Sequence, residues 1–257
     1  MSVNLIGKLK SIPEKIYAIG AVCVIWQIVA VTKLVDNSTL PPFTSIISKL
    51  LFLFYTGDIL PHIGASLQRA FLGFLISVVA GVILGFLMGT WERFERILDP
   101  VMQVLRNTPA LALYPLFILV FGLGELSEVA IIFFGALWPV LMNTIEGVRT
   151  VDHVIVKGAK SMGASKFTLF SKVVLPSAFP TMFTGIRLCA SRSIIMLVAA
   201  EMLGADKGLG YMIFFSEKNY MVVEMYSGII MLVVIGVVIN KLLVSLESKV
   251  THWKESV

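Results

Sequence analysis

Residues 71–90 read FLGFLISVVAGVILGFLMGT, a stretch of twenty residues without a charged side chain. A helix needs about 20 mostly apolar residues to cross the hydrocarbon core of a bilayer, so this stretch is long enough to span a membrane. Its glycines Gly73, Gly81, Gly85 and Gly89 recur at intervals of four or eight residues. Because small residues let a neighbouring helix approach closely, we expect this span to be packed inside the protein.

The rest of the chain shares this apolar character. Of its 257 residues, 57% are hydrophobic and only 14% are charged, against about 25% charged in an ordinary soluble domain. This composition argues against a soluble enzyme, a disulfide scaffold and a disordered chain. The two cysteines, Cys23 and Cys189, lie in apolar runs without metal-ligand spacing, and we interpret them as packing residues.

Further apolar stretches predict an all-α, polytopic membrane protein with about six transmembrane helices. Besides residues 71–90, the expected spans are Ile16–Leu34, Leu111–Gly122, Val129–Met142, Phe183–Ala200 and Tyr226–Leu246. The first of these is too long for the apolar region of a signal peptide, which favours a membrane anchor. Two others, residues 111–122 and 129–142, are short, and prolines lie in or beside them. Short, proline-interrupted segments at membrane depth are tolerated inside protein or along a water-filled path, which is typical of a transporter.

The distribution of Lys and Arg predicts the orientation of these spans. With six spans, fourteen of the 21 basic residues lie on the side of both termini, four lie on the opposite side, and Arg69, Arg187 and Arg192 lie in or beside spans. The fourteen are Lys8, Lys10, Lys15, Arg93, Arg96, Arg106, Arg149, Lys157, Lys160, Lys166, Lys172, Lys241, Lys249 and Lys254. The positive-inside rule then places both termini in the cytoplasm.

This topology divides the chain into three parts. Residues 1–15 are an expected cytoplasmic segment, residues 16–246 a transmembrane domain, and residues 247–257 a cytoplasmic tail. The longest cytoplasmic stretch, residues 143–180, lies between the fourth and fifth spans. Asp152 is a good N-cap for a helix there, Gly163 is expected to end that helix, and Leu175-Pro176 is expected to end the segment before the next span. The pattern alone leaves two readings open: an amphipathic helix on the lipid surface, or a docking surface for a cytoplasmic partner.

The run Lys157-Gly158-Ala159-Lys160-Ser161-Met162-Gly163-Ala164-Ser165, followed by Val174-Leu175-Pro176 and Pro180, resembles the EAA loop of bacterial ABC importer permeases. The glycine, its spacing and the Leu-Pro pair match the family pattern. Lys157 stands where the family has glutamate, and Gly158 stands where it has alanine.

Other segments resemble the nitrate, sulfonate and taurine branch of these permeases. The matching residues, in chain order, are Leu40-Pro41, His62-Ile63, Ser66-Leu67, Arg69, Gly73, Pro109, Pro115-Leu116, Phe121-Gly122, Ala200-Glu201 and Gly208-Leu209-Gly210. The resemblance covers about residues 20–250. It implies a non-enzymatic translocation subunit in the bacterial cytoplasmic membrane that forms a dimer with a second copy, receives a small solute from an extracytoplasmic binding protein, and docks two ATPase subunits. The chain itself lacks the Gly-x-x-x-x-Gly-Lys-Ser/Thr phosphate-binding loop.

The resemblance implies which residues couple the chain to the ATPase: Lys157, Gly158, Ala159, Gly163, Ala164, Leu175 and Pro176. The candidates for the translocation path are Arg187, Ser191, Arg192 and Glu201, on and at the end of the fifth span. Arg192 lies deep in that span, where a charge faces protein or water. It either attracts an anionic solute or serves as an interhelical partner, and the sequence leaves both roles open. Glu201 could cap a helix, pair with a cation or contact the delivering protein.

Two other classes of function compete with this one. A stand-alone secondary transporter or channel would carry ionisable residues in several spans or an inverted repeat, and neither is evident. A membrane enzyme would need a catalytic cluster, but the sequence offers no carboxylate pair, Ser/His/Asp set or Cys/His set at reactive spacing. His62, His153 and His252 share no spacing, so we expect no metal site. We also expect no cofactor and no nucleic-acid partner, and membrane lipid is an expected partner.

Overall fold

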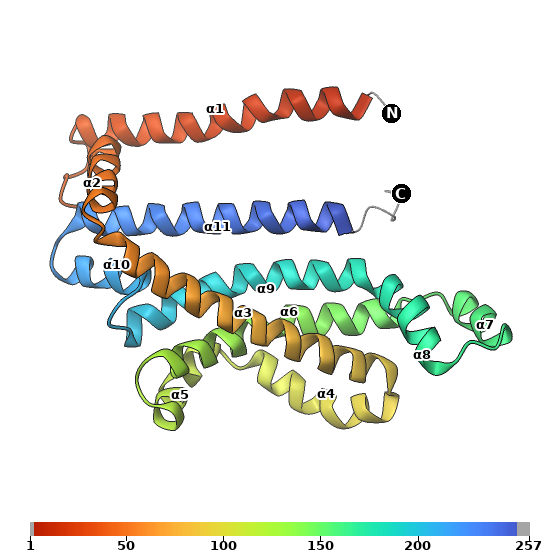
Figure 1. Cartoon of the computed structure of the whole chain (residues 1–257). Coiled ribbons are helices and arrows are strands. Elements are labelled where there is room, and N and C mark those ends of the chain that lie inside the picture. Colours follow the sequence, from red (N-terminus) through yellow and green to blue (C-terminus); the bar gives the residue numbers. More distant parts are fainter. Residues whose placement is uncertain (1–2, 251–257) are drawn as a thin grey trace. The chain divides into compact units, whose positions relative to one another are not determined.

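The computed structural model describes residues 3–250, with side chains described for residues 17–249. Within that range every regular element is a helix, as the sequence predicts (Figure 1). The elements are α1 (Val3–Val31), α2 (Phe43–Thr56), α3 (Ile59–Thr90), α4 (Glu92–Asn107), the 3₁₀-helix η1 (Ala110–Leu113), α5 (Tyr114–Phe121), α6 (Glu125–Arg149), α7 (His153–Ser161), α8 (Lys166–Leu169), the π-helix η2 (Phe170–Val174), α9 (Leu175–Gly204), α10 (Leu209–Lys218) and α11 (Val222–Val250). The part of the expected C-terminal tail from residue 251 onward lies outside the described residues.

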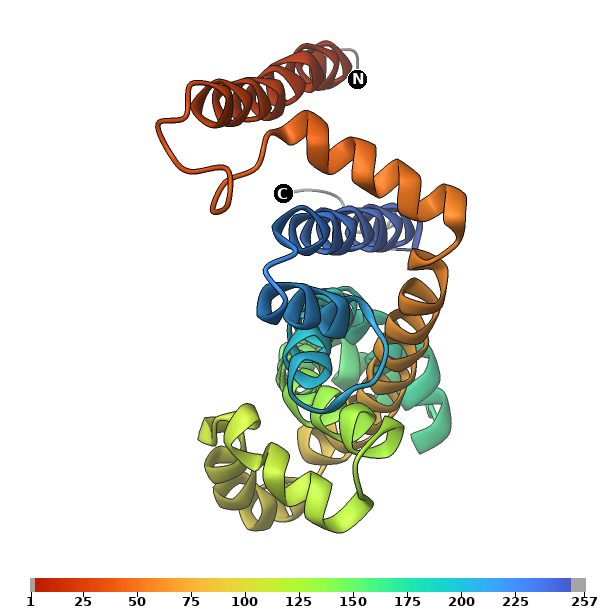
Figure 2. The same cartoon turned by 90° about the vertical axis from the view of Figure 1, so that its left-hand side faces the viewer.

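The chain divides into two compact units, one containing the chain up to Leu60 with Met212–Met231 and the other containing Pro61–Tyr211 and the chain from Leu232. In the first unit a loop joins α1 to α2 (Figure 2). The Trp26 indole N–H donates a hydrogen bond to the carbonyl of Pro41 in this loop at 3.0 Å. Lys49 of α2 forms an ion pair with Glu224 in the first turn of α11 at 2.7 Å.

In the second unit α3 packs against α6 through the glycines that the sequence singles out. A Cβ atom built on Gly81 would lie 2.9 Å from Cβ of Val140, and one built on Gly85 would lie 2.5 Å from Cβ of Thr144. The residue numbers of these contacts rise together along α3 and α6, so the two helices run in the same direction. The expected close approach of another helix is therefore confirmed, because any side chain at these positions would push α6 away.

Helix α9 packs against α6 in the opposite direction. A Cβ atom on Gly147 would lie 2.8 Å from the carbonyl oxygen of Ala178, and one on Gly185 would lie 2.8 Å from that of Pro139. Along α6, residue 139 lies beside residue 185 of α9 and residue 147 lies beside residue 178, so the residue numbers of the two helices run in opposite directions. Helix α6 is thus the central helix of this unit, with α3 parallel to it and α9 antiparallel.

Several expected boundaries were wrong. The expected short span at residues 129–142 is part of the 25-residue helix α6, which continues through Pro139. The Asn143 side chain donates to the Pro139 carbonyl at 2.8 Å, and the close packing on both sides holds the helix together across the proline. Leu175-Pro176 does not interrupt the helix, because the chain remains helical from Lys166 to Gly204. A five-residue π-helix just before Leu175 carries the chain into α9, and Pro176 sits in the first turn of α9, where a missing N–H costs little.

By length and composition, α3, α6 and α11 could each cross a membrane. Two bent pairs raise the number to five if each is one span: α4 with residues 110–121, bent by 93°, and residues 166–204 with α10, bent by 48°. The first bend confirms that the 111–122 segment is short and interrupted. In α1 the described apolar part, Tyr17–Val31, is shorter than a full span. The count of six therefore stays a prediction.

A group of charges around a buried arginine joins the three packed helices at one end. Arg69, near the start of α3, is 1% exposed and lies among three carboxylates. Its guanidinium nitrogens are 2.7 Å from Glu125, 2.6 Å from Glu128 and 3.0 Å from Glu201. Glu125 and Glu128 lie in the first turn of α6, and Glu201 lies in the last turn of α9. We call Ser66, Arg69, Glu125, Glu128 and Glu201 the charge cluster.

The charge cluster also fixes the turn between α9 and α10. Arg69 donates to the carbonyl of Lys207 at 2.6 Å, and the backbone N–H of Gly210 donates to Glu201 at 2.8 Å. Gly208 has a φ of +129°, and a Cβ there would overlap the Glu201 carboxylate. Only glycine satisfies both constraints at this position.

We predict that Arg69→Gln lowers the stability of the protein by about 3–5 kcal/mol, because it leaves buried carboxylates without their cation. The measurement is thermal unfolding of the purified protein in mild detergent. Arg96→Gln is the matched control, since Arg96 is exposed on α4 and pairs only loosely with Glu92, at 3.7 Å. Equal unfolding temperatures for the two variants would contradict the role given to Arg69.

Candidate functional site

The segment between α6 and α9 forms two short helices with well-defined ends. The Asp152 carboxylate accepts a hydrogen bond from the Val154 N–H at 2.7 Å, which confirms the expected N-cap of α7. Gly163 follows α7 with a φ of +79°, a conformation that glycine adopts without strain. Ser165 then caps α8 by accepting from the Thr168 N–H at 3.1 Å. The expected break at Gly163 is confirmed.

This segment exposes large apolar side chains. In Figure 1, α7 and α8 extend beyond the ends of α6 and α9. Met162 is 84% exposed and Phe167 is 79% exposed, and Val154 and Ile155 on α7 are also exposed. Such a patch on a projecting segment indicates an interaction surface for a protein or for lipid.

The residues expected to couple this segment to an ATPase divide into two groups. The first group consists of Lys157, Gly158, Gly163 and Pro176, which are exposed, and Ala164, which is half-buried. Ala159, by contrast, is buried, and Leu175 packs against the cluster formed by Phe86, Val148, Ala178 and Met182. The first group is available to a partner, whereas Ala159 and Leu175 attach the segment to the helices beneath it.

The four expected path residues lie in different surroundings. Arg187 forms an ion pair with Glu247 of α11 at 3.0 Å, which ties α9 to α11. Glu201 is buried in the charge cluster. Ser191 and Arg192 are exposed on α9. The structure therefore does not bring the four residues together at one site.

Arg192 lines a hollow of about 400 Å³ between α4, α6 and α9. Its lining consists of Arg106, Thr108, Ala110, Gly135, Trp138, Pro139, Met142, Arg192 and Met196. Arg106 was not among the expected path residues, because it was assigned to a cytoplasmic loop. The place of Arg106 in this hollow depends on the bend after α4, and the sequence does not predict that bend.

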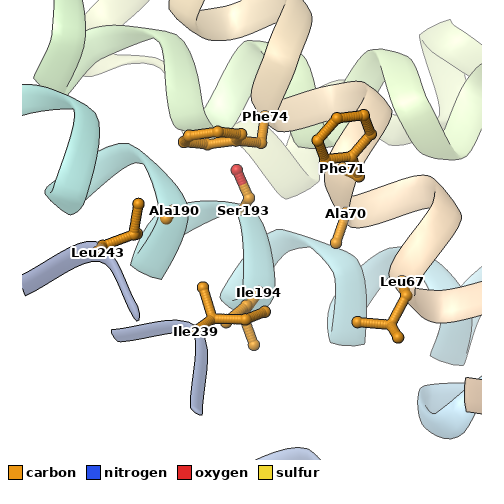
Figure 3. A pocket seen from close by; sticks show the side chains of 9 residues that line it. All are labelled: Leu67, Ala70, Phe71, Phe74, Ala190, Ser193, Ile194, Ile239 and Leu243. Carbon is orange, nitrogen blue, oxygen red and sulfur yellow. The ribbon is translucent and has the colours of Figure 1, made fainter. Parts of the chain in front are cut away.

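A second hollow, also about 400 Å³, lies between α3, α9 and α11. In Figure 3 its walls are Phe71 and Phe74 of α3, Ile194 of α9, and Ile239 and Leu243 of α11. The one hydroxyl in it, that of Ser193, donates to the carbonyl of Cys189 at 3.0 Å. This hollow offers no charged group to a polar solute, in contrast to the one at Arg192.

The sequence reasoning also missed the charge cluster as a unit. Arg69 was noted as one of three arginines in or beside spans and as a residue matching the permease branch, but it was not linked to Glu201, and Glu125 and Glu128 were not singled out. Two acids three residues apart before a long apolar run were the available signal. Among the described residues, no group of three or more His, Cys, Asp or Glu side chains is placed to hold a metal ion.

Comparison with known proteins identifies relatives over nearly the whole chain. The protein named "Putative aliphatic sulfonates transport permease protein SsuC" of Bacillus subtilis (strain 168) is 36% identical over 237 residues, which are 92% of this chain and 86% of that protein. The taurine transport system permease protein TauC of Escherichia coli (strain K12) is 30% identical over 95% of this chain and 90% of its own length. The nitrate import permease protein NrtB of Leptolyngbya laminosa is 34% identical over 74% of this chain and 68% of its own length.

Solved structures share the fold. A chain of the MetNI methionine ABC transporter in an inward facing conformation matches 75% of this chain and 95% of its own length, with a TM-score of 0.67 and 17% identity. A chain of an amino acid ABC transporter matches 77% of this chain and 95% of its own length, with a TM-score of 0.57 and 19% identity.

The family model described as "Binding-protein-dependent transport system inner membrane component" matches residues 77–252. This range includes α6, the projecting α7–α8 segment and the hollow's lining on α4, α6 and α9. The match covers more than half of the chain, so this protein belongs to the family of inner membrane components of binding-protein-dependent transport systems.

Proposed function

We propose that this chain is the translocation subunit of an ATP-driven importer, that it acts as a dimer with a second copy, and that a partner ATPase docks on the α7–α8 segment. The observation that carries the docking site is the exposure of Met162 and Phe167 on a segment that projects beyond the packed helices. The partner ATPase hydrolyses ATP, and this chain supplies the path for the solute. An extracytoplasmic binding protein would deliver the solute at the opposite end, where the charge cluster fixes the turn between α9 and α10.

The continuity of the helix from Lys166 to Gly204 supports a mechanism of coupling. A displacement of α8 by the ATPase would be transmitted along α9, which carries Arg187, Arg192 and Glu201. The π-helix at residues 170–174 lies where this motion would enter α9, and π-helical turns are frequent at functional sites. ATP binding would then shift the equilibrium between inward-open and outward-open arrangements of the spans.

The relatives support a small anion as the solute. The names of the three relatives refer to aliphatic sulfonates, taurine and nitrate, which all carry an oxyanion group. The presence of an unpaired arginine beside the path agrees with such a solute, since within residues 17–249 no carboxylate forms an ion pair with Arg192.

The proposed orientation places both termini in the cytoplasm. It rests on the excess of Lys and Arg on that side and agrees with the helix directions. Helices α3 and α6 run in the same direction, so the chain must cross back between them, and the bent pair of α4 with residues 110–121 supplies that crossing. With α1 counted as a span, the total is six.

Docking on α7–α8 is tested by Gly163→Leu. Leucine is strained at a φ of +79°, so we expect the turn to rearrange and both uptake and co-purification of the ATPase to be lost. The measurements are solute uptake in cells and recovery of the ATPase with the tagged permease. Gly57→Leu is the matched control, because it places a leucine at a φ of +83° with nothing within 4 Å of the added Cβ, outside the α7–α8 segment. Normal uptake by a stably expressed Gly163→Leu protein would refute the docking site.

The orientation is tested by labelling single cysteines in a variant whose Cys23 and Cys189 are replaced by alanine. We expect Asp58→Cys and Asp206→Cys to react with a membrane-impermeant maleimide in intact cells, because the positive-inside rule places both outside. Lys166→Cys should react only after the membrane is opened. Labelling of Lys166→Cys from outside would overturn the proposed topology.

A further inference from the structure

The hollow at Arg192 contains a second arginine and no acidic residue. Arg106 enters it from the end of α4, and Arg192 enters it from the middle of α9. We propose that these two arginines together bind a small oxyanion, so that the permease itself holds the solute at a defined site during translocation. This inference rests on the proposed function and names a binding site and its ligand class within it.

The charges in the hollow favour an anion. Within the described part of the chain neither arginine forms an ion pair, and Arg106 donates a hydrogen bond to the Gln103 side-chain oxygen at 2.7 Å. Two guanidinium groups in one hollow repel each other, and a bound anion relieves that repulsion. A guanidinium also matches an oxyanion in shape, because its planar donors can bind two oxygens at once.

The remaining walls suit a solute with a small apolar body. Trp138 and Met142 of α6 and Met196 of α9 supply an indole ring and two thioethers beside the arginines. A volume of about 400 Å³ falls within the usual range for small-ligand sites. An oxyanion on a short carbon chain would place its head on the arginines and its chain on these side chains.

Helix α4 supplies a polar approach to the hollow. Asp99, Gln103 and Arg106 lie on one face, where the Gln103 amide donates to Asp99 at 3.3 Å and Arg106 donates to Gln103. Beside this polar face Phe94, Leu98 and Met102 pack against the cluster of Met88, Leu141 and Ile145. A helix at membrane depth keeps such a polar face only where it borders water or protein, so we assign this face to the solute's route.

The test uses the permease purified with its ATPase partner in lipid nanodiscs, without ATP and without the binding protein. The probe is 2-bromoethanesulfonate, whose bromine quenches tryptophan fluorescence on contact. We expect saturable quenching in the unaltered protein, and its loss in Trp138→Phe, which removes the reporter in the hollow. The matched cation, (2-bromoethyl)trimethylammonium, carries the same bromoethyl group and should not quench Trp138. Equal quenching by the cation, or no saturable quenching by the sulfonate, would overturn the proposal.

Variants of the two arginines assign the site. Arg106→Gln and Arg192→Gln should each raise the half-saturating sulfonate concentration by about tenfold or more, as expected for the loss of one charge-assisted hydrogen bond. Arg106→Lys and Arg192→Lys should lose less, since lysine keeps the charge but not the planar donors. Arg93→Gln should change nothing, because Arg93 is exposed on another face of α4 and does not line the hollow.

Unchanged binding in both glutamine variants would refute the site even if the cation is excluded. If one glutamine variant fails to assemble, two measurements still test the site: binding by the lysine variant at that position, and the comparison of anion with cation in the unaltered protein. Failure of the proposed function would give a different result: the unaltered complex, supplied with its binding protein and ATP, would show no uptake. A complex that takes up solute but does not bind the probe would refute this inference alone.

Discussion

The guanidinium of Arg69 joins three helices at one end of their packed bundle. Arg69 bonds to Glu125, Glu128 and Glu201 and to the backbone after α9, so that α3, α6, α9 and the turn into α10 share a single buried attachment point. Away from this point α3 and α6 touch through glycines and one hydrogen bond, which the Ser77 hydroxyl donates to the Phe133 carbonyl at 3.1 Å. The other ends of α6 and α9 carry separate ion pairs, Arg149 with Glu95 of α4 and Arg187 with Glu247 of α11. One end is thus joined through a single buried guanidinium and the other through separate pairs and apolar packing, an arrangement that suits the proposed movement of the α7–α8 end by a partner.

The same helices carry the proposed path. Helix α9 begins as a continuation of α8, passes Arg192 in the hollow and ends at Glu201 in the charge cluster, so it connects three sites of different character. Arg187 adds a link to α11 through Glu247. The polar face of α4, ending in Arg106, completes the wall opposite Arg192. The chain thus uses its charged side chains in different ways: Arg69 pairs with three carboxylates, Arg187 pairs with Glu247, and the two arginines of the hollow form no ion pair within the described residues and stay available to the proposed solute.

The sequence predicted those features that depend on local chemistry. Apolar run lengths predicted a helical membrane protein, the glycine spacing predicted the α3–α6 contact, and Asp152 and Gly163 predicted the limits of α7. It failed where neighbours override a local signal. Pro139 and Pro176 do not end their helices, because close packing and a π-turn accommodate them. The charge cluster and the pairing of Arg106 with Arg192 escaped detection because their members are far apart in the chain and meet only through helix packing.

The central claim is that events on the α7–α8 segment, which we propose to be cytoplasmic, change the access of solvent to the hollow at Arg192. The most direct measurement is the rate at which a charged thiol reagent modifies Thr108→Cys, a lining position, from each face of proteoliposomes containing the full transporter in a background without Cys23 and Cys189. The account predicts modification from the cytoplasmic face without nucleotide, and from the opposite face once hydrolysis of ATP in the presence of vanadate has trapped ADP and vanadate on the ATPase. Modification from the same face at the same rate in both states would contradict it.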